Sequence, residues 1–212
     1  MALLSHAQKR AALTLTAGIA VAGVLAGCGA HSAPPRTAPP DLTRVPVGLH
    51  WDTFSGIAIP AGDDGPATTG VTATGYKHTP QGAALAGIDH TVRLSTADNS
   101  AWAPIAAAEV TSSPGADAWK LARARLNISV PANPSLAPRI LGYRITSYQP
   151  GTAAVTAYSV YPDKSLAATA IEVVWSDGDW RLHLPDPGST ARTVTAIRSV
   201  PTTGLVRLEG AR

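Results

Sequence analysis

The spacing of apolar residues changes at residue 139, and this change constrains the fold more than any other feature of the sequence. Before it, apolar residues recur at the spacing of one helix face, with proline and glycine between the segments. After it, apolar and polar residues alternate, as they do in strands that bury one face. Helices followed by consecutive antiparallel strands predict an α+β fold, in which short N-terminal helices pack on one face of an antiparallel meander.

The expected elements follow from this spacing and from the turn residues between segments. Three helices are expected over residues 80–94, 101–110 and 115–127. Four strands are expected over residues 139–149, 152–161, 166–176 and 180–184, with one more near residues 193–197 or 205–208. Short turns join the strands, such as Asp177-Gly178 in the last hairpin, and they indicate antiparallel neighbours.

Helix ends and helix faces can also be assigned. Thr79 and Pro80 suit the N-cap and the first position of the first helix. In the third helix, Trp119, Leu121 and Leu126 are expected to face the core. Lys120, Arg123 and Arg125 are expected to face mostly solvent.

The N-terminus has the pattern of a secretory signal peptide. Lys9 and Arg10 precede an apolar segment over residues 11–26, and no acidic residue occurs before Asp41. The apolar segment is shorter than the ~20 residues that a membrane-spanning helix needs. Residues 1–27 are therefore expected to be removed during export.

The signal sequence ends in Leu-Ala-Gly-Cys, which resembles the lipobox of bacterial lipoproteins. The resemblance implies cleavage between Gly27 and Cys28, and attachment of a diacylglyceryl group, with palmitate-like chains, to the Cys28 thiol. Cys28 is the only cysteine, so the chain can form no internal disulfide. The expected partner is the membrane itself, through a lipid anchor on its extracytoplasmic face.

A proline-rich tether and one domain follow the signal peptide. The tether is expected over residues 28–48, where prolines favour an extended chain that rises ~3.1 Å per residue. The single α+β domain is expected over residues 49–212. This arrangement would let the domain stand clear of the membrane.

Charge and motifs argue against several classes of function. Lysine and arginine total 17 and aspartate and glutamate 14, and removal of Lys9 and Arg10 leaves the chain close to neutral. Nucleic acid is not an expected partner, because its binding needs a dense basic stripe and the basic residues here are scattered. The sequence has no nucleophile elbow, phosphate-binding loop or zinc-ligand motif. No metal, no cofactor and no enzymatic activity are expected.

Several polar residues have both a functional and a structural interpretation. Asp63 and Asp64 could be metal ligands, but adjacent acids in a turn are expected to face solvent. Asp89 and His90 suggest an acid–base pair, but helix neighbours point about 100° apart, so a solvated pair is favoured. His78 stands at a helix start and is expected to help cap it. Glu172 is expected to point away from the core, because the residues on either side of it are apolar.

Two motifs and a few single residues carry a resemblance to known families. They are Trp51, Gly56, Pro60, Gly65-Pro66, the segment Gly-Tyr-Lys-His-Thr-Pro-Gln-Gly-Ala-Ala at residues 75–84, and Val-Trp-Ser-Asp-Gly-Asp-Trp-Arg-Leu at residues 174–182. With these residues the chain resembles uncharacterised actinobacterial envelope proteins associated with conjugative elements. The order of elements resembles the nuclear-transport-factor-two-like cone fold, and this resemblance implies that the antiparallel sheet is curved and cone-like. The resemblance implies an accessory of a conjugation- or secretion-type assembly.

The expected function is that of a non-catalytic, lipid-anchored interaction module with a protein partner in the cell envelope. Two alternatives stay open. The cone could bind a small apolar ligand, with Tyr143, Tyr158 and Trp175 as candidate pocket residues. It could also hold an isomerase-like site, which needs an acid beside a tyrosine in an apolar cavity.

Overall fold

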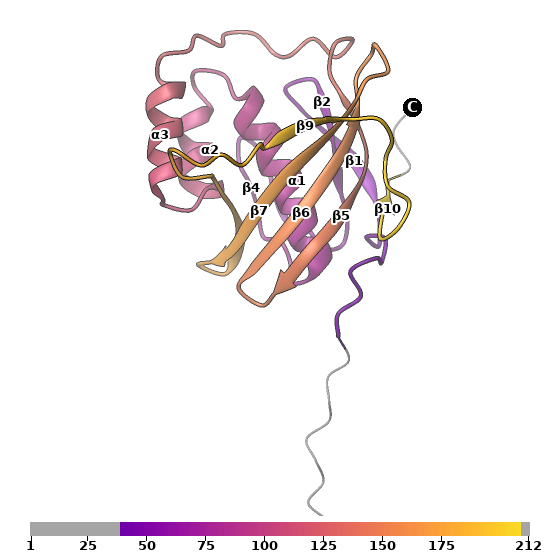
Figure 1. Cartoon of the computed structure of the whole chain (residues 1–212). Helices are drawn as coiled ribbons and strands as arrows, with labels where there is room; N and C mark the ends of the chain where they lie inside the picture. The colour runs from indigo at the N-terminus through magenta and orange to yellow at the C-terminus, as the bar shows by residue number, and fades with distance from the viewer. Residues whose placement is uncertain (1–38, 209–212) are drawn as a thin grey trace, which may run out of the picture. The chain divides into compact units, whose positions relative to one another are not determined.

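The computed structural model describes residues 39–208, and Figure 1 shows how their elements are arranged. In chain order these elements are β1 (His50–Phe54), β2 (Ile57–Ala61), β3 (Thr68–Thr69), β4 (Ala73–Thr74), α1 (Pro80–Thr96), α2 (Trp102–Glu109), α3 (Pro114–Arg123), β5 (Arg139–Gln149), β6 (Thr152–Val160), β7 (Leu166–Ser176), β8 (Asp179–His183), β9 (Val194–Ile197) and β10 (Val206–Arg207). Three helices and a largely antiparallel sheet confirm the α+β class.

The main sheet is an antiparallel meander with an added strand at each side. Its strands follow the order β10-β5-β6-β7-β8, and β9 pairs with β7 beside β8. The β7–β8 turn is the hairpin expected from the sequence, since Asp177 and Gly178 both have positive φ angles, of 53° and 81°. The sequence offered two C-terminal segments as candidates for one more strand, and both are strands in the structure. The first is β9, which pairs with β7, and the second is β10, which pairs with β5.

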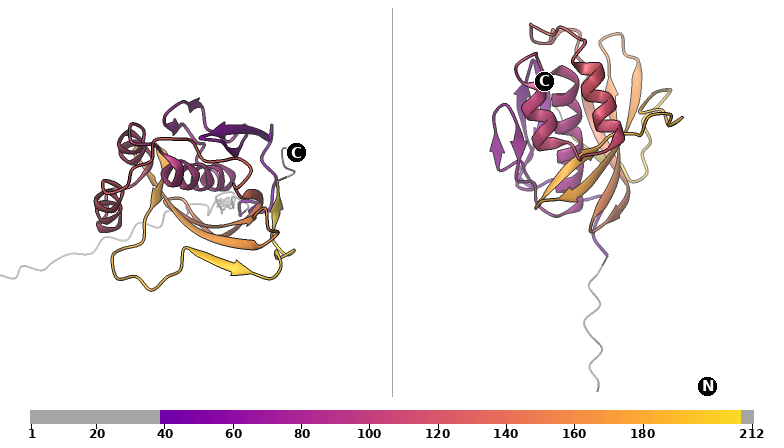
Figure 2. Two further views of the ribbon diagram at one scale, coloured as in Figure 1. Left: turned by 90° about the horizontal axis from the view of Figure 1, so that it is seen from above. Right: turned by 90° about the vertical axis from the view of Figure 1, so that its left-hand side faces the viewer.

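Helix α1 is the central layer of the domain. Figure 2 shows it between the concave face of the main sheet and the β1–β2 hairpin. It begins where expected: the Thr79 hydroxyl accepts a hydrogen bond from the Gly82 backbone N–H at 3.0 Å, and Pro80 follows the cap. Alanine and glycine allow a close approach to the sheet, since a Cβ added to Gly87 would lie 2.8 Å from Cγ2 of Ile171.

The β1–β2 hairpin was not expected from the sequence. Its turn residues Ser55 and Gly56 both have positive φ angles, of 49° and 84°, as a tight hairpin requires. Ile57 and Ile59 bury one face of β2 against the core. Each strand has only five residues and β2 contains Pro60, so the alternation is too short to indicate strands.

The C-terminal segment wraps around the sheet. After β8 it pairs as β9 along one end of β7, then crosses the outer face of the sheet and ends as β10 beside β5 (Figures 1 and 2). The outer face is therefore partly covered, opposite the helices.

The expected orientation of α3 is confirmed for Trp119, which packs against the core, but it is wrong for Leu121, Leu126 and Arg123. Leu121 and Leu126 are 67% and 58% exposed, whereas Arg123 is only 4% exposed. The Arg123 guanidinium donates hydrogen bonds to the carbonyls of Ala97, at 2.8 Å, and Leu126, at 3.1 Å. The helix ends at Arg123, so Leu126 does not continue its apolar face. The buried Arg123 side chain instead fastens the end of α3 to the carbonyls of Ala97 and Leu126.

Part of the expected tether, which was to extend to residue 48, packs on the domain. Arg44 donates hydrogen bonds to Asp64 at 3.1 Å and to Gln81 at 2.9 Å, and Leu42 packs against the core. Asp64, expected in solvent, is 4% exposed because Arg44 and Thr79 bind its carboxylate. Residues 41–48 thus contribute to the domain.

The predicted signal peptide, Gly27 and the lipidation site Cys28 lie outside the described residues. Among residues 39–208, no helix combines the length and the apolar character needed to span a bilayer.

Candidate functional site

The two motifs singled out in the sequence lie in direct contact. The Asp179 carboxylate accepts hydrogen bonds from the backbone N–H groups of Gly75, at 2.7 Å, and Tyr76, at 3.0 Å. The Trp180 indole donates to the Lys77 carbonyl at 3.0 Å. The last hairpin therefore holds the segment that leads into α1, which explains why both motifs combine turn residues with aromatics.

His78 belongs to an aromatic cluster and does not cap α1. Its ring stacks on Trp175, with centroids 4.0 Å apart, and its Nε2 contacts the Pro150 carbonyl. Trp175 meets the fully buried Trp180 edge to face at 5.3 Å. These contacts join the segment before α1 to the ends of three sheet strands.

A buried polar network lies on the other side of this contact. The Tyr76 hydroxyl donates to Asp89 at 2.6 Å, and Arg93 Nε donates to the same carboxylate at 2.6 Å. Burial, together with the Asp89 charge, raises the pKa of Tyr76 well above its ordinary value, so the phenol stays a hydrogen-bond donor. Arg93 also binds the carbonyls of Gly70 and Val71, and covers the Phe54 ring.

His90 faces away from Asp89 and has its own partners. Its Nδ1 lies 2.9 Å from Oε2 of Glu109, and its Nε2 lies 3.0 Å from the Trp180 carbonyl. A carbonyl can only accept, so Nε2 carries a proton, and a second proton is shared between Nδ1 and Glu109. The expectation that Asp89 and His90 are solvated is wrong, because α1 is covered on both sides and leaves them 2% and 1% exposed.

This network is a structural tie. Asp89 has two partners, and Glu109 receives the Ala73 backbone N–H at 2.8 Å in addition to His90. Tyr76 beside Asp89 is an acid–tyrosine pair of the type an isomerase needs, but neither residue lines the two hollows described below. The hydrogen bonds of this network hold α1, α2 and β8 together.

The three candidate pocket residues are not brought together. Tyr143 lies fully buried on the helix side of β5, opposite Ala157, whereas Tyr158 is the next residue of β6 and faces the other way. Trp175 stacks on His78 at the end of β7. Burial, with the nearby Asp64 charge, raises the pKa of Tyr143. None of the three lines either hollow.

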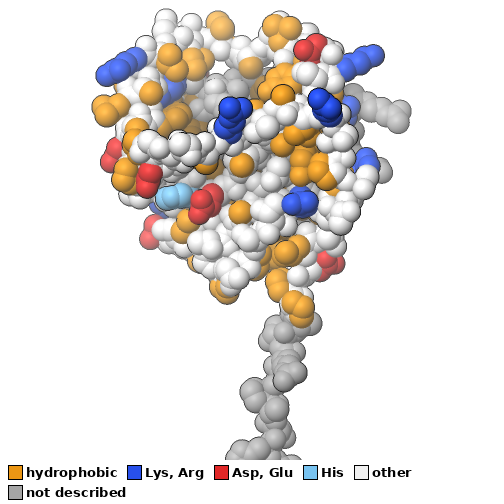
Figure 3. All heavy atoms as spheres, in the orientation of Figure 1, with side chains coloured by type: hydrophobic (Ala, Val, Ile, Leu, Met, Phe, Trp, Pro, Cys, Tyr) orange, Lys and Arg blue, Asp and Glu red, His pale blue; other side chains and the backbone are white. Residues whose placement is uncertain are grey.

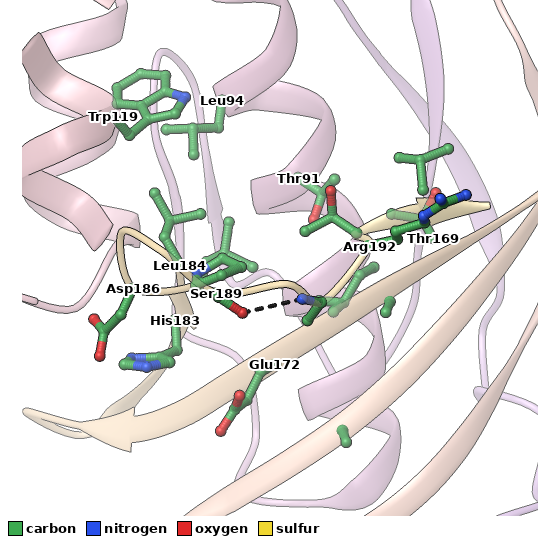
Figure 4. A pocket seen from close by; sticks show the side chains of 18 of the residues that line it. Thr91, Leu94, Trp119, Thr169, Glu172, His183, Leu184, Asp186, Ser189 and Arg192 are labelled. Atoms are coloured by element: carbon green, nitrogen blue, oxygen red, sulfur yellow. Dashed lines mark hydrogen bonds between the residues drawn. The ribbon is translucent and has the colours of Figure 1, made fainter. Parts of the chain in front are cut away.

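The larger hollow lies between α1 and the edge of the sheet. It has a volume of about 720 Å³ and is bounded by α1, the middle of β7, the end of β8, the β8–β9 connection and Trp119 of α3. Figure 4 shows Leu94 and Trp119 on one side, and Glu172, His183 and Asp186 gathered at one end. Glu172 is exposed, as expected from the alternation of β7.

A second hollow, of about 270 Å³, continues from the first toward the far ends of β5 and β6. Residues that line both hollows are Thr91, Ser95, Thr169, Ile171 and Val194. We name the combined space the α1–sheet groove. It arises because α1 touches the sheet at Gly87 and leaves space beside it further along, at Thr91 and Ser95.

The α1 wall of the groove is less polar than its residues suggest. The hydroxyls of Thr91, Ser95 and Thr96 donate to helix carbonyls four residues earlier, at 2.7, 2.7 and 2.8 Å. These donors are satisfied within the helix, so the threonines can present their methyl groups to the groove. The wall therefore favours an apolar occupant.

Charge is confined to the first hollow. Glu172, Asp186 and Arg192 line it, together with His183, whereas no charged residue lines the second. On the face seen in Figure 3, the basic side chains are spread singly, whereas two acidic side chains lie on either side of a histidine. Within residues 39–208 no three His, Cys, Asp or Glu side chains are grouped as metal ligands.

Sequence reasoning missed the groove. Its polar signal is the run of hydroxyl residues at helical spacing along the second half of α1, next to Ile88 and Val92. That run could have marked a face that does not pack tightly. The strand residues of the groove could not have been selected, because they alternate like any half-buried strand.

Comparison with known proteins gives a family and no activity. No curated protein and no solved structure matches the chain. One family model, described as a domain of unknown function (DUF8175), matches residues 16–203. Since this match covers most of the sequence, the chain belongs to the family described as domain of unknown function DUF8175.

Proposed function

We propose that this chain is a non-catalytic binding module of the cell envelope, anchored by a lipid on Cys28, which holds a small apolar ligand in the α1–sheet groove. The observation that carries the proposal is the groove itself. It combines volume, apolar walls and a few polar groups at one end, which are the properties of ligand sites. A helix across the concave face of a meander also supports the resemblance to the cone fold.

A binding role fits the polar groups better than catalysis does. The acid–tyrosine pair, Tyr76 and Asp89, is buried and paired with Arg93. Glu172 lines the groove but is exposed to solvent, so it does not lie in the apolar cavity that an isomerase-like acid needs.

The proposal is tested by titrating the full chain with Nile red, whose fluorescence rises in apolar sites. Ser95 is an exposed residue that lines both hollows, so Ser95→Phe should fill their junction and abolish the signal. Ser112→Phe makes the same change at an exposed position outside the groove and should bind like the wild type. Equal binding by both variants would refute the site.

A second candidate function is docking of an envelope protein, as in a conjugation- or secretion-type assembly. It is favoured by four exposed apolar side chains on α3 and the segment after it: Leu121, Leu126, Val130 and Leu136. In-cell crosslinking followed by mass spectrometry should recover secretion-channel components with the wild type. Leu121→Asp combined with Leu126→Asp should lose them, and unchanged recovery would place the contact elsewhere.

A further inference from the structure

We infer that the occupant of the α1–sheet groove is a single linear fatty-acid chain, with its tail in the second hollow and its carboxylate at Arg192. This inference rests on the proposed function and names the class of ligand. It is carried by the separation of charge between the two hollows and by the position of Arg192 where they join.

The second hollow has the chemistry of a tail site. Its walls are apolar side chains, such as Ile88 and Ile140, and hydroxyl residues, with no charged residue among them. Thr91 and Thr96 bind their hydroxyls to their own helix, so burying a polymethylene chain beside them leaves no donor unpaired.

The shape of the second hollow favours one extended chain. Its wall on β7 runs from Ala167 to Ile171, a span of ~13 Å at the usual rise of a strand. Its volume of about 270 Å³ over that length makes it narrow. A linear chain can follow such a channel, whereas a fused-ring ligand of similar volume is too wide for it.

Arg192 supplies the head-group site. Figure 4 shows it beside Thr169, one of the residues that line both hollows. Among residues 39–208 its guanidinium has no hydrogen bond or ion pair. Glu172 and Asp186 lie at the other end of the first hollow, so an anion is favoured only at the junction.

The experiment is calorimetric titration of the full chain with octanoate, decanoate and dodecanoate, and with dodecanol as the uncharged analogue. All samples carry Cys28→Ser, so that no acyl group on this residue competes. Each added methylene buried in the second hollow should tighten binding about fourfold, which corresponds to ~0.8 kcal/mol. Affinity independent of chain length would overturn the tail assignment.

Two variants test the chemistry of the walls. Arg192→Gln should weaken dodecanoate about fivefold, the scale of an exposed ion pair, and leave dodecanol unchanged. Arg198→Gln is the matched control, because Arg198 is exposed and lies outside both hollows. Thr91→Val keeps the side-chain shape and should preserve affinity, whereas a loss would mean that the hydroxyl serves a polar ligand.

The outcomes separate the two proposals. If Nile red binds in a Ser95-dependent way but fatty acids do not, the groove is a ligand site and the fatty-acid assignment is wrong. If dodecanoate and dodecanol lose affinity equally in Arg192→Gln, the head-group assignment is wrong. If neither Nile red nor fatty acids bind, the proposed function falls together with the inference.

Discussion

The Nδ1 atom of His90 lies 2.9 Å from Oε2 of Glu109, and both side chains are at most 1% exposed. The pair joins α1 to the last residue of α2. Its outer contacts extend the connection, since Glu109 accepts the Ala73 N–H and His90 binds the Trp180 carbonyl. One pair of side chains thus holds four segments that are distant in sequence.

Removing the Glu109 carboxylate should destabilise the domain strongly. Glu109→Leu leaves His90 and the Ala73 N–H without their buried partner, and we expect a loss of about 3–5 kcal/mol in the free energy of unfolding. Urea denaturation measures it. Glu109→Gln is the informative control, because an amide can accept from Ala73 and donate to an uncharged His90, so its loss should be smaller, about 1 kcal/mol. Equal losses would show that charge, and not hydrogen bonding, holds the site.

The contact between the two sequence motifs depends on Asp179. Its two carboxylate oxygens accept the Gly75 and Tyr76 N–H groups. Asp179→Ala should therefore lower the free energy of unfolding by about 2 kcal/mol, as expected for hydrogen bonds to a charged acceptor. Asp179→Asn keeps one acceptor oxygen and should lose about half as much. A thermal melt of Asp179→Ala that matches the wild type would contradict this role.

The close approach of α1 to the sheet depends on Gly87. A Cβ at this position would lie 2.8 Å from Ile171 and 3.3 Å from Val173, so Gly87→Ala should cost about 1–3 kcal/mol through overpacking. Gly151→Ala is the matched control, because a Cβ there meets nothing within 4 Å. Chemical denaturation of the two variants compares them directly. If Gly87→Ala were as stable as Gly151→Ala, α1 could move away from the sheet without a loss in the free energy of unfolding.

The lipid anchor predicted from the sequence is tested by Cys28→Ala. Without the thiol no diacylglyceryl group can be attached, so the protein should be released or remain as an uncleaved precursor. Cell fractionation and intact-mass measurement distinguish these forms. A cleaved Cys28→Ala protein that still fractionates with the membrane would refute the anchor.

The spacing of apolar residues and the turn and capping residues predicted the three helices and the main strands, and several of their ends. The Thr79 cap, the Asp177-Gly178 hairpin and the outward direction of Glu172 depend on neighbouring residues only, and the structure confirms each of them. The lipobox is likewise a local motif, and it stays a prediction.

Only the tertiary structure decided which polar residues are buried and where space is left. Asp89 and His90 look like surface residues of a helix, but α1 lies between two layers, so both must find partners inside. Arg123 is buried because its helix ends there, and Leu121 is exposed because no other element covers it. The α1–sheet groove depends on the angle between a helix and a sheet, which many distant contacts set together, and no local spacing in the sequence encodes such an angle.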